Sequence, residues 1–335
     1  MEVSRLLFQA VCRNMLGVWG TPLEQGLVYG ILVLGVYLTY RILDYPDLTV
    51  DGSFPLGAAI AATAITKGIH PIIATFLGFF GGALAGTVTG FLNTKLKITG
   101  LLAGILTMTG LYSVNLRVMG GRSNLPLLRE STLVTMFQDR FGFEWGAILL
   151  FALIVVITKL ILDYFLHTEL GLAFRACGDN ERMIKALGVD TDLCKILGLA
   201  LANGLVGMSG SLVAQYQAFA DVGMGIGTVV AGLASVILGD AIFKPKGIIG
   251  ATFAAIFGSI LYRFTITIAL RAGFAATDLR LVTAILVIGA LSAPRLKEIP
   301  FLKKIIESRR SAKLEDEVEK REALQLIGSE KHASD

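Results

Sequence analysis

The sequence predicts an all-α fold, a polytopic bundle of membrane helices, some of them short or broken. Hydrophobic residues make up 54% of the 335-residue chain and charged residues only 17%, whereas soluble domains carry about 25% charged residues. The mean hydropathy is +0.70. About 20 apolar residues in a helix cross a bilayer core of roughly 30 Å, and such stretches recur along the chain. We therefore expect a multi-pass membrane protein in contact with lipid.

The first element expected is an amphipathic helix on the bilayer surface, formed by residues 1–20. Its apolar residues Leu6, Leu7, Ala10, Val11 and Met15 fall on one side of a helix. Residues 21–297 then form the transmembrane domain. Residues 298–335 mix charges of both signs, as in "RRSAKLEDEVEKREALQLI", which predicts a solvated cytosolic tail.

Apolar segments follow one another through the transmembrane domain, and all are predicted to be helical. Several are short and glycine-rich, which favours tilted, broken or re-entrant helices enclosed by protein, because unsatisfied backbone in lipid costs several kcal/mol per group. In "GFFGGALAGTVTG" a glycine recurs every fourth position, a pattern typical of close helix packing; a pore-lining stripe is the alternative. The nine segments are 25–40, 54–66, 69–92, 98–116, 145–162, 196–218, 222–239, 247–262 and 279–294.

The net charge is only +4 and the cations lie between apolar runs, which argues against nucleic-acid binding.

Lysine and arginine residues indicate the orientation of the chain in the membrane, because the cytoplasmic ends of spans carry an excess of them. Alternation of the spans then places residues 117–144 and the N-terminus outside. The ends expected to be cytosolic carry Lys95, Lys97, Arg175, Arg182, Lys185, Lys195, Lys244, Lys246, Arg295, Lys297, Lys303 and Lys304.

One polar interruption, between Asp163 and Lys195, has the pattern of a capped helix. Asp179 or Asn180 can cap a helix, Glu181 suits its first turn, and Gly188 can end it, which predicts about two helical turns. Three apolar residues on this helix, Met183, Ile184 and Leu187, are expected to be exposed. Such a face favours docking of a soluble partner, and an ordinary cytosolic loop is the alternative.

The stretch "GLAFRACGDNERMIKALGVDTDLCKILGLALANGLVGMSG" (171–210) resembles the cytosolic coupling segment of ABC importer permeases of the branched-chain amino acid and ribose type. The family pattern is R-A-x-G-x-N-x-x-x-A-x-x-x-G-I. Arg175, Ala176, Gly178, Asn180 and Gly188 occupy matching positions, Val189 replaces the final isoleucine, and Ile184 departs from the second alanine. The resemblance covers roughly residues 20–297. It is nearest to compact permeases of amino-acid importers, including those linked to tryptophan.

The resemblance implies a permease of a bacterial-type plasma (inner) membrane that works with several partners. These are paired ATPase subunits, a second permease copy in a homodimer or heterodimer, and an external substrate-binding protein. The chain contains no G-x-x-x-x-G-K-[ST] sequence, so ATP and magnesium are expected on the ATPases, and no enzymatic activity, catalytic residue or cofactor is expected here. The residues implied to dock the ATPase are Arg175, Ala176, Gly178, Asp179, Asn180, Glu181, Met183, Ile184, Ala186, Leu187 and Gly188.

Three carboxylates, Asp44, Asp47 and Asp51, precede the short apolar segment 54–66. A second acidic-then-small stretch, 220–235, occurs in the other half, and paired short segments of this kind are typical of inverted repeats around a translocation path. For Asp51 three roles stay open: Asp51 or Ser53 caps the helix near Phe54, Asp51 lines the path, or it forms a salt bridge with Arg41 or another cation. The candidate path residues are Asp51, Ser53, Phe54, Thr107, Asn203, Gln215 and Asp221.

Two rival functions are possible for such a membrane chain. An ion-coupled secondary transporter would use Asp51 and Asp221 as coupling sites and would need no ATPase. A membrane enzyme would need a nucleophile with an adjacent base, or a cluster of acids and histidines, and the sequence offers none. His70 and His167 stand apart from other ligand residues, so no metal site is expected. We expect an importer permease, with an amino acid as the first choice of solute and a sugar or nucleoside as the second.

Overall fold

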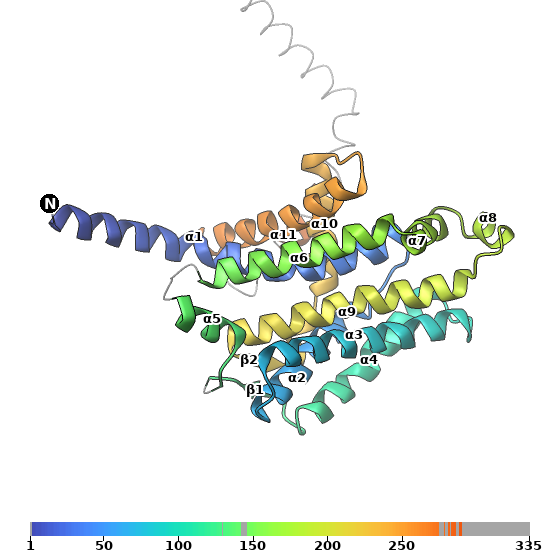
Figure 1. Ribbon diagram of the computed structural model, residues 1–335, viewed down its shortest axis with the longest axis horizontal. Helices are drawn as coiled ribbons and strands as arrows, with labels where there is room; N and C mark the ends of the chain where they lie inside the picture. The colour runs from blue at the N-terminus through green and yellow to red at the C-terminus, as the bar shows by residue number, and fades with distance from the viewer. Residues whose placement is uncertain are drawn as a thin grey trace, which may run out of the picture. The chain divides into compact units, whose positions relative to one another are not determined.

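The computed structural model describes residues 2–128, 130–141, 146–274, 278, 281, 283–285 and 288–289. The fold is almost entirely helical, as predicted (Figure 1). The elements in chain order are α1 (Glu2–Tyr37), the π-helix η1 (Leu38–Ile42), α2 (Val50–Thr66), α3 (Pro71–Thr94), α4 (Gly100–Val118), β1 (Asn124–Pro126), α5 (Leu133–Phe141), α6 (Gly146–His167), α7 (Glu169–Asp179), α8 (Glu181–Ala186), α9 (Thr191–Gln217), β2 (Phe219–Asp221), the 3-10 helix η2 (Val222–Gly225), α10 (Thr228–Phe243) and α11 (Ile248–Arg271).

Among the described residues, seven helices are long and apolar enough to cross a membrane, and the 17-residue α2 is a shorter apolar helix. These eight helices coincide with the first eight predicted segments. The ninth predicted segment, 279–294, lies largely outside the described residues, and the predicted tail 298–335 lies wholly outside them. Helix α1 runs without a break from Glu2 through Pro22 to Tyr37, and the surface position of residues 1–20 stays a prediction.

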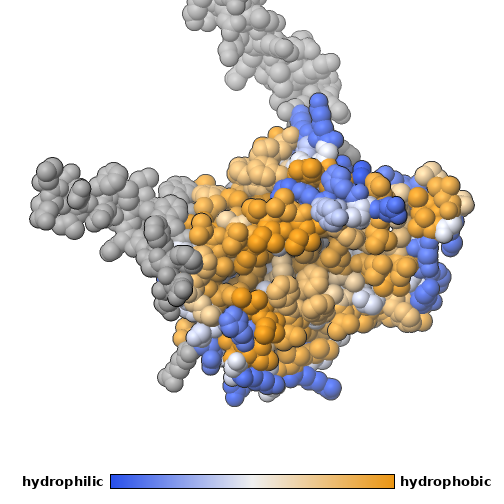
Figure 2. All heavy atoms as spheres, viewed as in Figure 1, coloured by the Kyte–Doolittle hydropathy of each residue, from blue (hydrophilic) through white to orange (hydrophobic). Residues whose placement is uncertain are grey.

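Three helices, α1, α2 and α9, form the buried centre of the bundle, and 13 of the 17 residues of α2 are buried. The spans Gly20–Ile42 and Thr191–Gln217 are each 72% buried, whereas the other candidate spans are 28–39% buried. Helix α9 packs chiefly against α3, α2 and α1, and Figure 1 shows it running alongside α3. The outer helices present apolar side chains, and the face seen in Figure 2 is largely hydrophobic. This arrangement suits a bundle whose perimeter lies in lipid.

The glycine stripe on α3 packs against α9, as the close-packing prediction requires. A Cβ atom at Gly82 would overlap the carbonyl oxygen of Asn203, and one at Gly86 would overlap that of Leu199. Gly90 faces the backbone of Ile196, at 2.8 Å from such a Cβ to its Cα. The stripe is therefore a helix contact within the subunit and does not line a pore.

The two halves of the chain also meet at a small antiparallel sheet. Strand β1 pairs with β2, with Asn124 opposite Asp221 and Pro126 opposite Phe219. This pairing ties the loop that follows α4 to the turn between α9 and α10. The predicted inverted repeat of the two halves stays a prediction.

Candidate functional site

The segment that links α6 to α9 forms two short helices, α7 and α8, joined at Asn180. Asn180 has extended backbone (φ −156°, ψ 90°), and its Oδ1 accepts a hydrogen bond from the amide of Met183 at 3.0 Å. Asn180 is therefore the N-cap of α8, and Asp179 is the last residue of α7. Gly188 follows the C-cap with φ +88°, a conformation that glycine adopts readily. The predicted cap and stop of this helix are confirmed.

The exposed apolar face of α8 is smaller than predicted. The Met183 side chain is 54% exposed and that of Leu187 is 71% exposed, but Ile184 is only 7% exposed. The prediction that Ile184 lies on the surface is wrong, because its side chain joins the core cluster that includes Cys177 and Cys194. A large side chain at this position, where the family pattern has alanine, therefore seats α8 against α7 and α9.

An ion pair and a close backbone contact hold this segment to the bundle. Lys195 Nζ on α9 lies 2.7 Å from Glu181 Oε2, and this hydrogen bond lowers the pKa of Glu181 from its usual value. Gly178 on α7 approaches η1 so closely that a Cβ there would overlap the carbonyl oxygen of Ile42. Close packing against η1 therefore explains why the family pattern has a glycine at the position of Gly178. A movement of α7 would therefore displace η1, which follows the end of α1.

A buried polar cluster lies at the start of α2, and Asn203 of α9 is its centre. Asn203 has no exposed surface. Its Nδ2 donates to Asp47 Oδ2 at 2.7 Å, and its Oδ1 accepts from Ser53 Oγ at 2.7 Å. Asp47 Oδ1 also accepts from the amide of Thr49 at 2.9 Å. We call Asp47, Thr49, Ser53 and Asn203 the α2 junction.

A chain of hydroxyl groups extends the α2 junction toward α3 and α4. Thr49 Oγ1 lies 2.7 Å from Thr89 Oγ1, which donates to Thr107 Oγ1 at 2.9 Å. All three threonines are buried. Since buried polar groups are costly unless paired, this chain fixes the relative positions of α2, α3 and α4.

Asp51 caps a helix, but not the one predicted. Its carboxylate accepts from the amides of Gly227 and Val229, at 3.1 and 2.8 Å. It also accepts from Thr228 Oγ1 at 2.9 Å, so Asp51 caps α10 from the other half of the chain. The prediction that Asp51 or Ser53 caps α2 is wrong, because α2 already begins at Val50 and Ser53 donates to Asn203. Within the described residues, Asp51 forms no ion pair with Arg41 or with another cation.

The remaining candidate path residues also connect elements of the subunit. Buried Phe54 stacks on Tyr29 with ring centroids 5.6 Å apart. Gln215 accepts from the amide of Leu133 at 3.1 Å and donates to Thr75 Oγ1 at 2.8 Å. Asp221 accepts from the amide of Gly223 at 2.7 Å, and so caps η2. The lining of a path by these residues stays a prediction.

Sequence reasoning missed Arg263, a cation in the second half of span α11. Its guanidinium carbon lies 3.6 Å from the centroid of the Tyr29 ring, a cation–π geometry. Its buried Nε has no hydrogen-bond partner among the described residues. Arg263 lines a cavity of about 440 Å³ together with Tyr29, Tyr262 and Thr228. A lone arginine within an apolar run was the available signal, because such a charge is expensive in a bilayer.

Comparison with known proteins agrees with this architecture. The family model "Branched-chain amino acid transport system / permease component" matches residues 21–291. A tyrosine transport system permease protein of Clostridioides difficile is 47% identical over 274 residues, 82% of this chain and 90% of that protein. An uncharacterized protein of Rickettsia prowazekii is 35% identical over 83% of this chain and 98% of its own.

More distant relatives carry other solutes in their names. The ribose import permease protein of Bacillus subtilis is 27% identical over 65% of this chain and 66% of that protein. No solved structure matches the chain. The family model spans most of the chain, and the relatives from Clostridioides difficile and Rickettsia prowazekii each cover more than four fifths of it. The chain therefore belongs to the family "Branched-chain amino acid transport system / permease component", and it is a multi-pass inner-membrane subunit of an ABC importer for a small solute.

Proposed function

We propose that this permease imports an amino acid and is driven by ATPase subunits that dock on α7 and α8. The observation that carries the proposal is the exposed apolar face of α8, where Met183 and Leu187 project from a helix that is capped at its N-terminus. An exposed apolar face on a short, capped helix gains by packing into a groove on another protein. The family to which the chain belongs supports ATPase and binding-protein partners.

The packing offers a route by which docking reaches the membrane. Helix α8 is followed directly by α9, and α7 contacts η1 through Gly178. Helices α9 and α1 are the two most buried spans. Closure of the ATPases would therefore move these two helices together and rock the permease between inward-open and outward-open states. A second permease copy, in a homodimer, would complete the path.

An amino acid is favoured over a sugar by likeness and by chemistry. The 47% identical relative is a tyrosine permease, whereas the ribose permease is 27% identical. The cavity beside Arg263 holds a cation that can meet a carboxylate, and it holds aromatic walls. A sugar offers no charge to such a cation. An external binding protein would deliver the solute, and a nucleoside is the remaining alternative.

The test is co-purification of an ATPase with the parent chain and with Ala186→Glu. Ala186 lies exposed on α8, so the new carboxylate changes the docking face without entering the core. Ala186→Ser is the matched control, because it keeps the small size and adds no charge. We expect the ATPase and ATP turnover with the parent and the serine variant, and loss of both with the glutamate variant.

The opposite result would favour a different class of transporter. If no ATPase associates with any of the three chains, while reconstituted protein moves solute on an ion gradient, the protein is a secondary transporter. Competition of labelled amino-acid uptake by unlabelled amino acids and by ribose then separates the two solute classes.

A further inference from the structure

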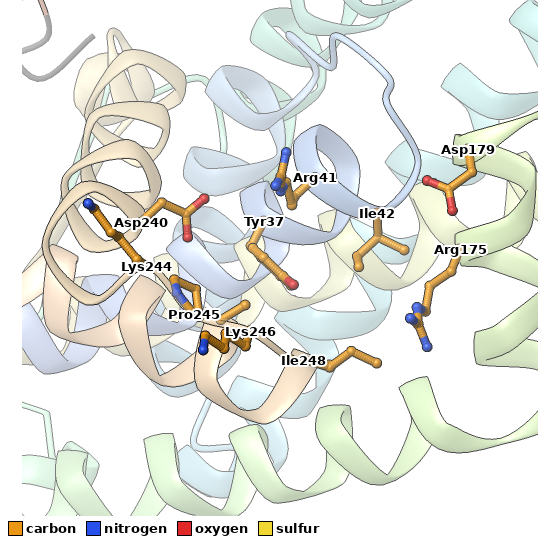
Figure 3. A pocket seen from close by; sticks show the side chains of 12 residues that line it. Tyr37, Arg41, Ile42, Arg175, Asp179, Asp240, Lys244, Pro245, Lys246 and Ile248 are labelled. Carbon is orange, nitrogen blue, oxygen red and sulfur yellow. The ribbon is translucent and has the colours of Figure 1, made fainter. Parts of the chain in front are cut away.

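A polar cavity of about 550 Å³ opens at the end of the bundle that carries α7 and α8, the segment proposed above to dock the ATPase and called the coupling segment below. Its walls come from the end of α1 with η1, from α7, from α10 and from the turn into α11. Figure 3 shows Asp240 and Lys244 on one side of the cavity and Arg175 and Asp179 on the other, with Tyr37 between them. The coupling segment therefore forms part of the wall.

The lining carries an excess of positive charge. Its cations are Arg41, Arg175, Lys244 and Lys246, and its carboxylates are Asp179 and Asp240. Four cations against two carboxylates leave two positive charges. Among the described residues, none of the four cations forms an ion pair within 4.0 Å. Their charge is thus available to an anion.

Two of the cations, Arg41 and Lys244, lie where a helix ends beside the cavity. Arg41 lies on η1, a single π-helical turn at the end of a long α-helix, and π-turns recur at functional sites. Lys244 has φ +43° although it is not glycine. This left-handed residue is the C-cap of α10, and its amide donates to the carbonyl oxygen of Asp240 at 3.0 Å. Both helix ends hold a cation beside the cavity.

Apolar side chains lie beside the polar cavity. Ile242 and Phe243 end α10 and are 55% and 42% exposed, and Ile249 and Phe253 begin α11 and are 59% and 51% exposed. Phe243 and Phe253 pack edge to face, with centroids 5.9 Å apart. A cationic pocket next to an exposed apolar surface matches a molecule with an anionic head and apolar chains.

We propose that the cavity binds the phosphate headgroup of an anionic phospholipid of the cytosolic leaflet, whose acyl chains lie along the adjoining ends of α10 and α11. Basic pockets between membrane helices on the cytoplasmic side suit such headgroups. The leaflet follows from the orientation in the proposed function, in which α8 faces the cytosol. The headgroup bridges Arg175 on α7 to Arg41 on η1 and to Lys246 in the α10–α11 turn.

The bridge has a consequence for coupling. Arg175 belongs to the segment that docks the ATPase, and Gly178 on the same helix contacts Ile42 of η1. A bound headgroup therefore holds α7 in the position seen here. ATP turnover by the assembled importer is expected to rise when anionic lipid is supplied.

Native mass spectrometry of the purified full chain tests the binding. The probes are phosphatidylglycerol, phosphatidylcholine with the same acyl chains, and inorganic phosphate. We expect phosphatidylglycerol to be retained by the parent, and at least tenfold weaker retention by the double variant Arg41→Gln with Lys246→Gln. The double variant Lys95→Gln with Lys97→Gln removes the same charge from the same end, outside the cavity, and should retain the lipid like the parent. Lys246→Gln alone, on an exposed turn, serves if the pocket double variant is misfolded.

The proposal is overturned by equal retention of phosphatidylglycerol by the pocket variants and the parent, or by retention of phosphatidylcholine equal to that of phosphatidylglycerol. Displacement of the lipid by inorganic phosphate alone also overturns it and would make the cavity a site for free anions. A second copy of the chain that excludes lipid from α10 and α11 would appear as a dimer without bound lipid, and it also counts against the proposal. None of these measurements needs an ATPase, so failure here is separate from failure of ATPase co-purification.

Discussion

The proposed coupling segment, α7 with α8, and the α2 junction are built in opposite ways. In the coupling segment, hydrogen bonds join near neighbours in sequence, as between Asn180 and Met183, and the surface is exposed. In the α2 junction, Asn203 binds Ser53 and Asp47 across 150 and 156 residues, and every member is buried. A locally held segment can shift as one piece when a partner binds. A junction held by long-range buried bonds resists such change.

Helix α9 connects the two regions. Lys195 at its start binds Glu181, and Asn203 lies eight residues later, about 12 Å along the helix at 1.5 Å per residue. In the proposed function, a displacement of the coupling segment would reach the α2 junction through one continuous helix. The junction, held by buried hydrogen bonds, would then carry the movement to α2 and α3.

The largest effect is expected from Asn203→Leu in the α2 junction. This variant keeps the branched shape and the number of side-chain heavy atoms, but it removes the bonds from Asn203 to the buried Asp47 carboxylate and the Ser53 hydroxyl. Asp47 then keeps only the Thr49 amide, and Ser53 keeps only the Val50 carbonyl at 3.4 Å. Burying an unpaired polar group costs about 1 to 3 kcal/mol, and more for a charged one. We expect a loss of about 3 kcal/mol, measured as a lower Tm in detergent. Thr109→Val is the control, since the exposed Thr109 bonds only to its own helix; an equal Tm for both variants would show that the junction is not structural.

The next effect concerns the contact between the coupling segment and η1. In Gly178→Ala, the new Cβ overlaps the backbone carbonyl of Ile42, which a rotamer change cannot relieve. Overpacking costs about 1 to 3 kcal/mol. We expect a folded chain with weaker ATPase binding and lower ATP turnover. Gly110→Ala is the matched control, because nothing lies within 4 Å of a Cβ there. Unchanged turnover in Gly178→Ala would remove η1 from the coupling route.

The contrast also explains what the sequence could predict. The caps of α8 were predictable because a cap is a short-range feature: Asn180, Glu181 and Gly188 sit within nine positions. The glycine stripe of α3 was predictable for the same reason. The hydrogen-bond partner of Asp51 lies 176 residues away at Gly227, and no local sequence pattern predicts this contact. The burial of Ile184 could not be predicted from the sequence either, because it depends on how α8 packs against α7 and α9.

A smaller effect is expected from Asp51→Ala. Its carboxylate caps α10 through the amides of Gly227 and Val229, and loss of a capping side chain costs about 1 kcal/mol. We expect a Tm loss of that size, and a smaller loss for Asp51→Asn, which keeps one acceptor oxygen. In an ATP-driven importer, transport by both variants should stay insensitive to the ion gradient. Gradient dependence in the parent that disappears in Asp51→Asn would instead make Asp51 a coupling site.

The smallest effect is expected from the exposed ion pair between Glu181 and Lys195, and it is tested by changing the pH. The hydrogen bond from Lys195 lowers the pKa of Glu181 below its usual 4.5. A lowered carboxylate pKa stabilises the folded state above 4.5, and the contribution is lost as the pH falls through the lower folded value. Because the Glu181 side chain is 45% exposed, the pair is worth less than about 1 kcal/mol. Between pH 8 and 5 we therefore expect ATPase binding by the parent and by Glu181→Gln to differ by a small, constant factor, measured by titration at several pH values. If the difference between the two chains vanished by pH 6, protonation of Glu181 would already occur there, and the ion pair with Lys195 would not hold α8 against α9.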